Sequence, residues 1–230
     1  MPERALASAT ERGPSQVQRA VSLLRDMIVT NRLLPGSNHL EAELAAMLEM
    51  SRTPVREAAI ILEAQGLVEV VPRRGIRILS ISPQDMDEIY SVLTELESLA
   101  AHDVARRGPT AAELAGLRAL IEEMEAALAR DDRTAWAEAD DRFHSLLVAL
   151  AGNRRLEQVV AMFSDQVRRA RLLTLMIRPR PDQSNADHRD LVEAIARGDA
   201  EGARQIHRNH RKRAKELMLG LLERHGFRSV

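Results

Sequence analysis

Hydrophobic residues in the first third of the chain recur every three or four positions, which is the spacing of one face of a helix. The pattern predicts a helix over residues 17–31, ended by Pro35-Gly36, and a short helix over 41–48. Helix is therefore the main element expected at the start of the chain. The face of the first helix that would turn inward carries Val17, Val21, Leu24 and Ile28.

A third helix is expected directly after this pair. Ser51 or Thr53 can cap its N-terminus, and Pro54 fits the first turn, where its missing N–H costs no hydrogen bond. The helix would continue to Gly66, because glycine readily adopts the left-handed conformation found at helix C-termini. Two short helices joined by a tight turn are the pattern of a helix-turn-helix.

Alternation replaces the helical spacing after Gly66. Residues 67–71 and 76–79 are rich in β-branched side chains, and the tetrapeptide Pro72-Arg73-Arg74-Gly75 separates them. This arrangement predicts a small hairpin. Three helices and a hairpin are therefore expected over residues 15–80, and residues 1–14 are expected to form a flexible tail.

Beyond the junction at residues 80–83 the strand signals disappear, and a series of helices is expected. Pro179 and Pro181 break the longest of these segments, while single glycines mark other helix ends. The expected fold is mainly α: the three helices and hairpin, joined to an antiparallel all-α bundle of about six helices over 83–225. The helix starts are expected at Ser82, Thr110, Asp131 or Asp132, Asn153, Asn185 and Asp199.

The composition limits the kinds of site that the chain can carry. The 33 basic and 34 acidic residues nearly balance, so any surface for nucleic acid must be local. The chain has no cysteine, which excludes disulfides and thiolate ligands and leaves histidine and carboxylates for a metal site. No apolar run approaches the ~20 residues that a membrane span requires, and we expect a cytoplasmic protein without membrane contact.

The front of the predicted third helix is chemically suited to DNA. Free N–H groups and hydroxyls there can bind phosphate oxygens, and arginine can bond guanine through two hydrogen bonds in the major groove. Arg73 and Arg74, just before Gly75 at the hairpin tip, could reach a neighbouring groove or the backbone. A small helical domain with solvated arginines would look the same at this level. The candidate residues on the helix are Ser51, Arg52, Thr53 and Arg56.

A second group of residues has the chemistry of a metal site. Asp140 and His144 are four residues apart, so they share one face of a predicted helix. His188 and His210 lie on later helices and can point inward in a bundle. Three imidazoles and one carboxylate suit zinc first, with nickel, cobalt or manganese also compatible. On residue type alone the four could equally be surface or core residues, and two neighbours compete for the same role: Asp141 and His207.

The N-terminal part of the chain carries a series of short motifs in a definite order. They are Leu34-Pro35-Gly36, Glu41-Ala42-Glu43-Leu44-Ala45, Ser51-Arg52-Thr53-Pro54-Val55-Arg56-Glu57-Ala58, Leu62, Gly66-Leu67-Val68 and Arg73-Arg74-Gly75. Along its whole length this part resembles the winged helix-turn-helix of GntR-family transcription regulators.

The resemblance assigns roles to the DNA candidates. It implies that Arg52 and Arg56 read bases from the recognition helix, that Ser51 and Thr53 contact DNA beside them, and that residues 73–75 form the wing tip. The family often has a basic residue where this chain has Ala42, so one DNA contact is absent or replaced. The operator sequence is therefore not predicted.

The C-terminal part also carries ordered motifs. They are Asp140-Asp141-Arg142-Phe143-His144, Gly152-Asn153, His188 ahead of Ala194-Ile195, Gly198-Asp199, and His210. This order is similar to the FCD effector domain of the FadR-like subgroup of the same family. The resemblance implies that the helices of this part supply the dimer contacts, and that the metal ligands are Asp140, His144, His188 and His210.

The effector contacts are less defined. The family commonly has an arginine four residues before a glutamate in the first helix of this domain; here the glutamate is Glu97 and the arginine is replaced by Leu93. A partner for an acidic effector is therefore missing from its usual place. The remaining candidates for effector contacts are Arg168, Arg171 and Asn185.

Together these features predict a ligand-responsive transcription regulator. We expect a homodimeric repressor that binds palindromic double-stranded operator DNA. A small carboxylate metabolite bound at the metal site is expected to release the repressor from this DNA. The sequence has no glycine-rich phosphate loop and no recognisable catalytic triad, so we expect no enzymatic activity. A metal-dependent hydrolase on a helical bundle is the alternative.

Overall fold

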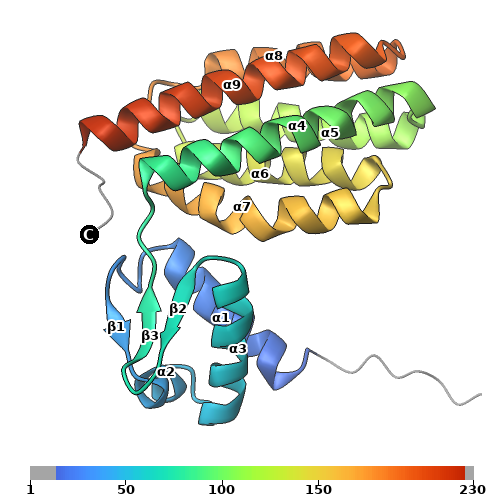
Figure 1. The fold of residues 1–230 in the computed structure, drawn as a ribbon. Coiled ribbons are helices and arrows are strands. Elements are labelled where there is room, and N and C mark those ends of the chain that lie inside the picture. The colour runs from blue at the N-terminus through green and yellow to red at the C-terminus, as the bar shows by residue number, and fades with distance from the viewer. Residues whose placement is uncertain (1–13, 226–230) are drawn as a thin grey trace, which may run out of the picture.

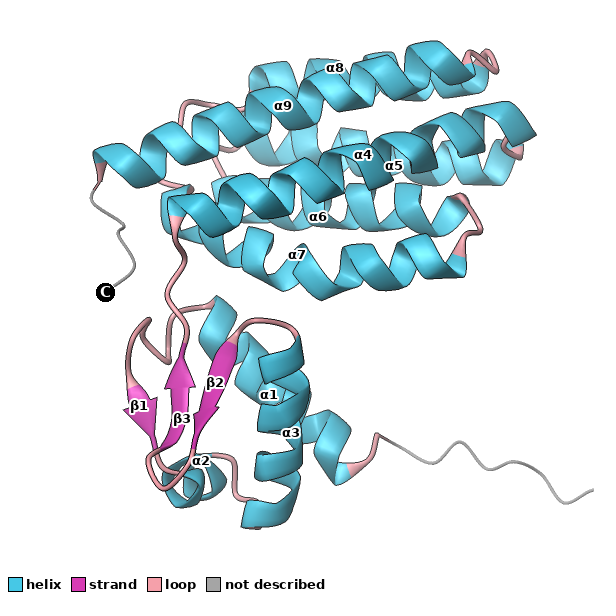
Figure 2. Cartoon of the chain, in the orientation of Figure 1, coloured by secondary structure: helices cyan, strands magenta, loops and turns pink. Residues whose placement is uncertain are grey.

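The computed structural model describes residues 14–225, and within them nine helices and one three-stranded sheet are found (Figures 1 and 2). The predicted mainly α fold is confirmed. The tail expected over 1–14 lies outside the described residues except for Pro14. None of the described helices is long and apolar enough to cross a membrane.

The N-terminal unit, defined here as the chain from α1 to β3, builds its core between helices and sheet. Leu24 and Ile28 of α1 pack with Leu62 of α3 and with Ile76 and Ile78 of the sheet, and all five are almost fully buried. The helical and alternating patterns therefore meet in one core, as the sequence predicts. The elements are α1 (Gln16–Val29), β1 (Asn38–His39), α2 (Glu41–Met47), α3 (Arg52–Ala64), β2 (Val68–Val71) and β3 (Gly75–Ile78).

The strand β1 is an addition that the sequence did not predict. It pairs antiparallel with β3, Asn38 opposite Arg77 and His39 opposite Ile76, which gives the strand order β1-β3-β2. Two residues are too short for an alternating pattern to be visible. Gly75 makes the pairing possible: it has φ +92°, and a Cβ atom there would overlap the carbonyl oxygen of His39.

Six long helices form the bundle, the second part of the chain (Figure 1). The side chains of Ser82, Thr110, Asp132, Asn153 and Asp199 cap five of them, as their sequence signals predicted. The helices are α4 (Pro83–Arg107), α5 (Ala111–Ala129), α6 (Arg133–Leu150), α7 (Arg154–Thr174), α8 (Asp182–Ala196) and α9 (Ala200–Arg224).

The start of α8 corrects one expectation. The helix begins at Asp182 after Pro181, three residues before the predicted start at Asn185. Asn185 is buried inside the helix, and its Oδ1 accepts a hydrogen bond of 2.8 Å from the indole N–H of Trp136. Asparagine is also a common N-cap residue, so the sequence alone does not distinguish a cap from a buried asparagine that bonds to another helix.

The helix α7 joins the two parts of the molecule. It lies on the side of the bundle nearest the N-terminal unit and packs on α1 (Figure 1). Arg25 Nε of α1 lies 2.6 Å from Asp165 Oδ2, and Gln166 donates a hydrogen bond of 2.8 Å to the carbonyl of Gln65. The buried side chain of Arg169 donates to the carbonyl of Leu79, at 2.5 Å, where the chain leaves the sheet.

The close approach of β1 to β3 predicts a specific cost for a side chain at Gly75. Gly75→Ala should lower the free energy of unfolding by about 3 kcal/mol, because backbone strain and steric overlap add. Gly36→Ala is the matched control, since Gly36 also has a positive φ, +77°, but its nearest neighbour lies 3.9 Å away. The control should lose only about 1–2 kcal/mol. Urea unfolding of both variants measures the difference, and equal losses would contradict the account.

Candidate functional site

The first candidate surface is the front of α3. Pro54 and Val55 lie on the buried face of the helix, and Arg52 and Thr53 beside them are exposed. Ser51 occupies the N-cap position and is exposed, but its side chain makes no capping hydrogen bond. The helix therefore begins with exposed hydroxyls and free N–H groups, which can receive an anion such as phosphate.

Arg56 and the hairpin tip extend this surface. The Arg56 side chain is 71% exposed and is held only loosely by Glu41, with its Nε 3.8 Å from the carboxylate. Arg73 and Arg74 are exposed in the turn between β2 and β3. Figure 1 shows this turn and the start of α3 at the same end of the N-terminal unit, remote from the bundle. Four exposed arginines at one end form a local basic surface in a chain of balanced charge.

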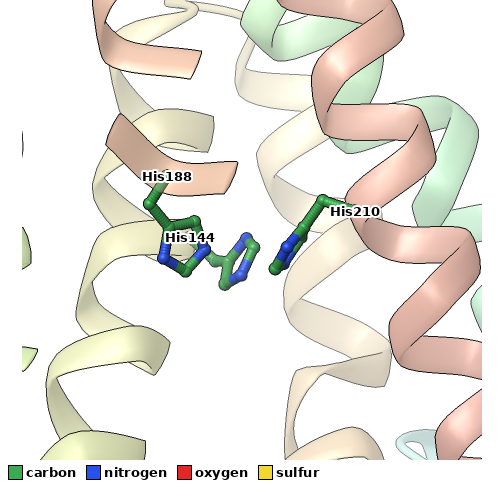
Figure 3. A group of neighbouring side chains, drawn as sticks. All are labelled: His144, His188 and His210. Carbon is green, nitrogen blue, oxygen red and sulfur yellow. The ribbon is translucent and has the colours of Figure 1, made fainter. Parts of the chain in front are cut away.

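The second candidate site lies inside the bundle. His144 of α6, His188 of α8 and His210 of α9 point toward one another (Figure 3). All three are buried, and each offers a ring nitrogen within 4.8 Å of the nitrogens of the other two. Three imidazoles converging from three helices are a geometry that can hold a metal ion.

Asp140 adds a carboxylate to this cluster. Its side chain is fully buried one turn before His144, with Oδ1 3.6 Å from His188 Nε2 and Oδ2 3.8 Å from His144 Nε2. The guanidinium of Arg171 forms an ion pair with the same carboxylate. The structure thus brings the four predicted ligands together, and the carboxylate of Asp140 lies near His144 and His188.

Unpaired polar atoms indicate that this quartet fits an ion. Four of its buried atoms have no hydrogen-bond or ion-pair partner among the described residues that satisfies them: Asp140 Oδ1, His144 Nε2, and His188 Nδ1 and Nε2. Leaving one such group unsatisfied costs about 1–3 kcal/mol. Several unsatisfied lone pairs at one point are what a cation-binding cluster presents without its cation.

The protonation state of the imidazoles also suits an ion. Burial lowers the pKa of His188 well below its usual value. Burial likewise lowers the pKa of His210 to about 4, although its hydrogen bond to Asp187 works in the opposite direction. Both rings are therefore neutral at pH 7, and neutral imidazole is the form that donates a lone pair to a metal.

The two competing residues lie on different sides of the cluster. His207 belongs to a second buried group with Glu97 and His144, whose ligand atoms also lie within 4.8 Å of one another. In that group the charge of Glu97 is already balanced by Arg211, at 3.1 Å. Asp141 pairs with Arg171 Nη1, at 2.5 Å.

A cavity of about 570 Å³ opens beside His144. Four arginines line it: Arg142, Arg168, Arg171 and Arg211. Burial lowers the pKa of Arg171 to about 10, so its guanidinium stays charged at pH 7. Arg168 and Arg171 were candidates from the sequence, whereas Asn185 does not line the cavity and instead bonds Trp136. Arg211 was missed, because arginine is abundant in this chain and a single one carries no signal.

The sequence of the chain also matches two family models. The FCD domain model matches residues 88–213, and the model of bacterial regulatory proteins of the gntR family matches residues 16–78. The chain belongs to the GntR family of bacterial transcription regulators. The basic surface formed by α3 and the hairpin tip thus lies within the GntR match of this regulator, and the buried quartet and cavity lie within its FCD match.

Relatives of this GntR-family protein are regulators as well. The chain is 44% identical over 148 residues, 64% of its length and 86% of the relative's, to an HTH-type transcriptional regulator in the TAR-I ttuE-ttuC' intergenic region of Agrobacterium vitis. It is 31% identical, over 82% of its length and 84% of the relative's, to a probable D-xylose utilization operon transcriptional repressor of Paenarthrobacter nicotinovorans.

Solved structures share the fold. McbR/YncC of Escherichia coli superposes with a TM-score of 0.76 at 22% identity, covering 89% of this chain and 97% of that one. The family and the relatives are transcription regulators and not enzymes, which removes the support for the hydrolase alternative.

Proposed function

We propose that this GntR-family protein is a ligand-responsive repressor that acts in the cytoplasm as a homodimer on a palindromic operator. In this proposal, residues 15–80 are the DNA-binding domain and residues 83–225 bind the effector and supply the dimer contacts. The cavity beside His144 carries the proposal, because it offers buried arginines next to a cluster suited to a cation. The relative named a repressor supports the direction of regulation.

The metal centre of this proposal uses Asp140, His144, His188 and His210. Three nitrogens and one carboxylate oxygen suit zinc, with nickel, cobalt or manganese as alternatives. A bound ion would supply positive charge and open coordination positions at the edge of the cavity. The effector proposed for this place is a small carboxylate metabolite.

The arginines favour an anionic effector. Arg171 is buried and pairs with both Asp140 and Asp141. An effector carboxylate that reaches the cavity can take over this guanidinium, and Arg168 is 40% exposed and also borders the cavity. A neutral molecule would gain neither contact.

The helix α7 provides a physical route from the cavity to the DNA-binding surface. Arg168 and Arg171 contact the cavity side, while Gln166 and Arg169, on the same helix, contact the N-terminal unit. Asp165 does both, since it lines the cavity and pairs with Arg25 of α1. A shift of α7 caused by an effector would therefore change how the N-terminal unit is held, as differential binding to two states requires.

Replacing the two base-reading candidates tests the DNA assignment. Arg52→Ala with Arg56→Ala should weaken binding to the DNA upstream of the gene by about 30-fold or more, because each lost base contact costs about 1–3 kcal/mol. Fluorescence anisotropy at one fixed salt concentration measures the affinity. The control replaces two exposed arginines at helix ends in the bundle, Arg130→Ala with Arg197→Ala, and should bind normally. Undiminished sequence-specific binding by the first variant would refute the assignment.

The route through α7 predicts a separate phenotype. Arg25→Ala removes the ion pair with Asp165 and should leave operator binding intact while reducing the effect of a carboxylate on it. The measured quantity is the ratio of operator affinities without and with succinate or acetate, for the zinc-loaded protein. Arg32→Ala, which removes an exposed ion pair with Asp26, is the control. If the carboxylate changes the operator affinity of wild type and Arg25→Ala shows the same ratio of affinities, this route is ruled out.

A further inference from the structure

We propose that Glu97 and Asp187 are positioning residues of the metal centre, each fixing one histidine so that its Nε2 faces the ion. This inference rests on the metal site of the proposed function and adds two residues that do not themselves bind the ion. Glu97 comes from α4 and Asp187 from α8, so the support arises on two separate elements.

Glu97 lies beside Nδ1 of His144, where His207 also approaches the ring. Its Oε2 is 3.1 Å from His144 Nδ1 and, like Nε2 of the same ring, has no hydrogen-bond partner among the described residues; that Nε2 lies 3.8 Å from Asp140 Oδ2. A neutral imidazole carries one proton. If Glu97 holds that proton on Nδ1, the lone pair of Nε2 is free for an ion.

The charge of Glu97 is itself fixed. Its side chain is 4% exposed, and Oε1 lies 3.1 Å from Arg211, whose guanidinium stacks over the ring of Tyr90 at 4.8 Å. With this guanidinium beside it, the carboxylate is placed as an acceptor for the Nδ1–H of His144.

Asp187 repeats the arrangement at a second histidine. Its Oδ2 lies 3.2 Å from His210 Nδ1, so this ring also offers Nε2 to the cluster. Arg213 lies 2.5 Å from the same oxygen, and Gln183 donates a hydrogen bond of 3.0 Å to Oδ1. Asp187 directly precedes His188 on α8, so one helix contributes a ligand and orients another ligand on α9.

His207 has a supporting place in this network. Its Nε2 lies 3.4 Å from His144 Nδ1 and 3.5 Å from Glu97, and its Nδ1 lies 3.4 Å from the hydroxyl of Ser98. Both of its ring nitrogens therefore face partners within the protein. In a metal site, a carboxylate beside Nδ1 of a histidine ligand typically orients the ring so that its Nε2 faces the ion. Glu97 and Asp187 occupy this position at two histidines, and a buried ion pair alone would not require it.

The experiment measures metal binding directly. Zinc affinity is determined by competition with a chromophoric chelator for wild type, Glu97→Gln and Asp187→Asn, each checked for fold by circular dichroism after chelation. Both variants should bind zinc about 10- to 100-fold more weakly. The absorption spectrum of the cobalt-loaded protein should change as well, because the rings lose their fixed orientation. Glu97→Asp, which keeps the charge but shortens the side chain, should recover part of the affinity.

Two controls separate the possible outcomes. Glu95→Gln, on the exposed side of α4 where Glu95 pairs with Arg208, should match wild type, and His144→Ala should lose most zinc binding. If Glu97→Gln and Asp187→Asn keep wild-type zinc affinity and cobalt spectra, the positioning role is refuted while the metal site stands. If wild type itself takes up no zinc, or His144→Ala binds as well as wild type, the proposed metal site fails. Should Glu97→Gln not fold, Asp187→Asn decides the question.

Discussion

The burial of charged and polar groups at the centre of the bundle is the constraint on which its arrangement depends. Asp140, Glu97 and Asp187 are nearly excluded from water, together with four histidines. Ionised groups in such a place are stable only when partners satisfy them. Arg171, Arg211 and Arg213 meet part of this need, and the lone pairs of the quartet that remain unpaired converge on one point. A cation bound there, as we propose, would complete the balance.

The same polar groups connect the interior of the bundle to the surface that faces DNA. Arg171 reaches Asp140 from α7, and five and six residues earlier the same helix holds Gln65 and Arg25 of the N-terminal unit. A rigid helix that contacts a ligand cavity on one side and another unit on the other can transmit a small displacement. The proposed link between ligand response and DNA binding therefore rests on the contacts of α7 with the cavity and with the N-terminal unit.

Much of the fold could be predicted from local signals. Helix starts at Ser82, Thr110 and Asn153 followed from side chains able to cap, and the hairpin followed from alternation around a turn. The predicted helix start at Asn185 was wrong, because asparagine often caps helices but this one is buried and bonded to Trp136. The strand β1 was missed because two residues show no periodicity.

The candidate site was predictable only in part. Spacing on one helix joins Asp140 to His144, but nothing local shows that His188 and His210 face them, and the resemblance to a family supplied that step. Glu97 was named only through the resemblance, and Arg211 was beyond sequence reasoning, since its importance comes from its contact with Glu97, more than a hundred residues away. Charged residues are frequent on helices, so only their burial distinguishes these two.

The central claim is that the occupied metal cavity controls operator binding, and one titration tests it most directly. The affinity of the wild-type dimer for its own upstream DNA would be measured at fixed salt, for zinc-loaded and chelated protein, across a panel of small carboxylates. The account predicts specific binding that at least one carboxylate weakens in the zinc-loaded protein and leaves unchanged in the chelated one. Specific binding that no carboxylate alters, or that responds equally with and without zinc, would contradict it.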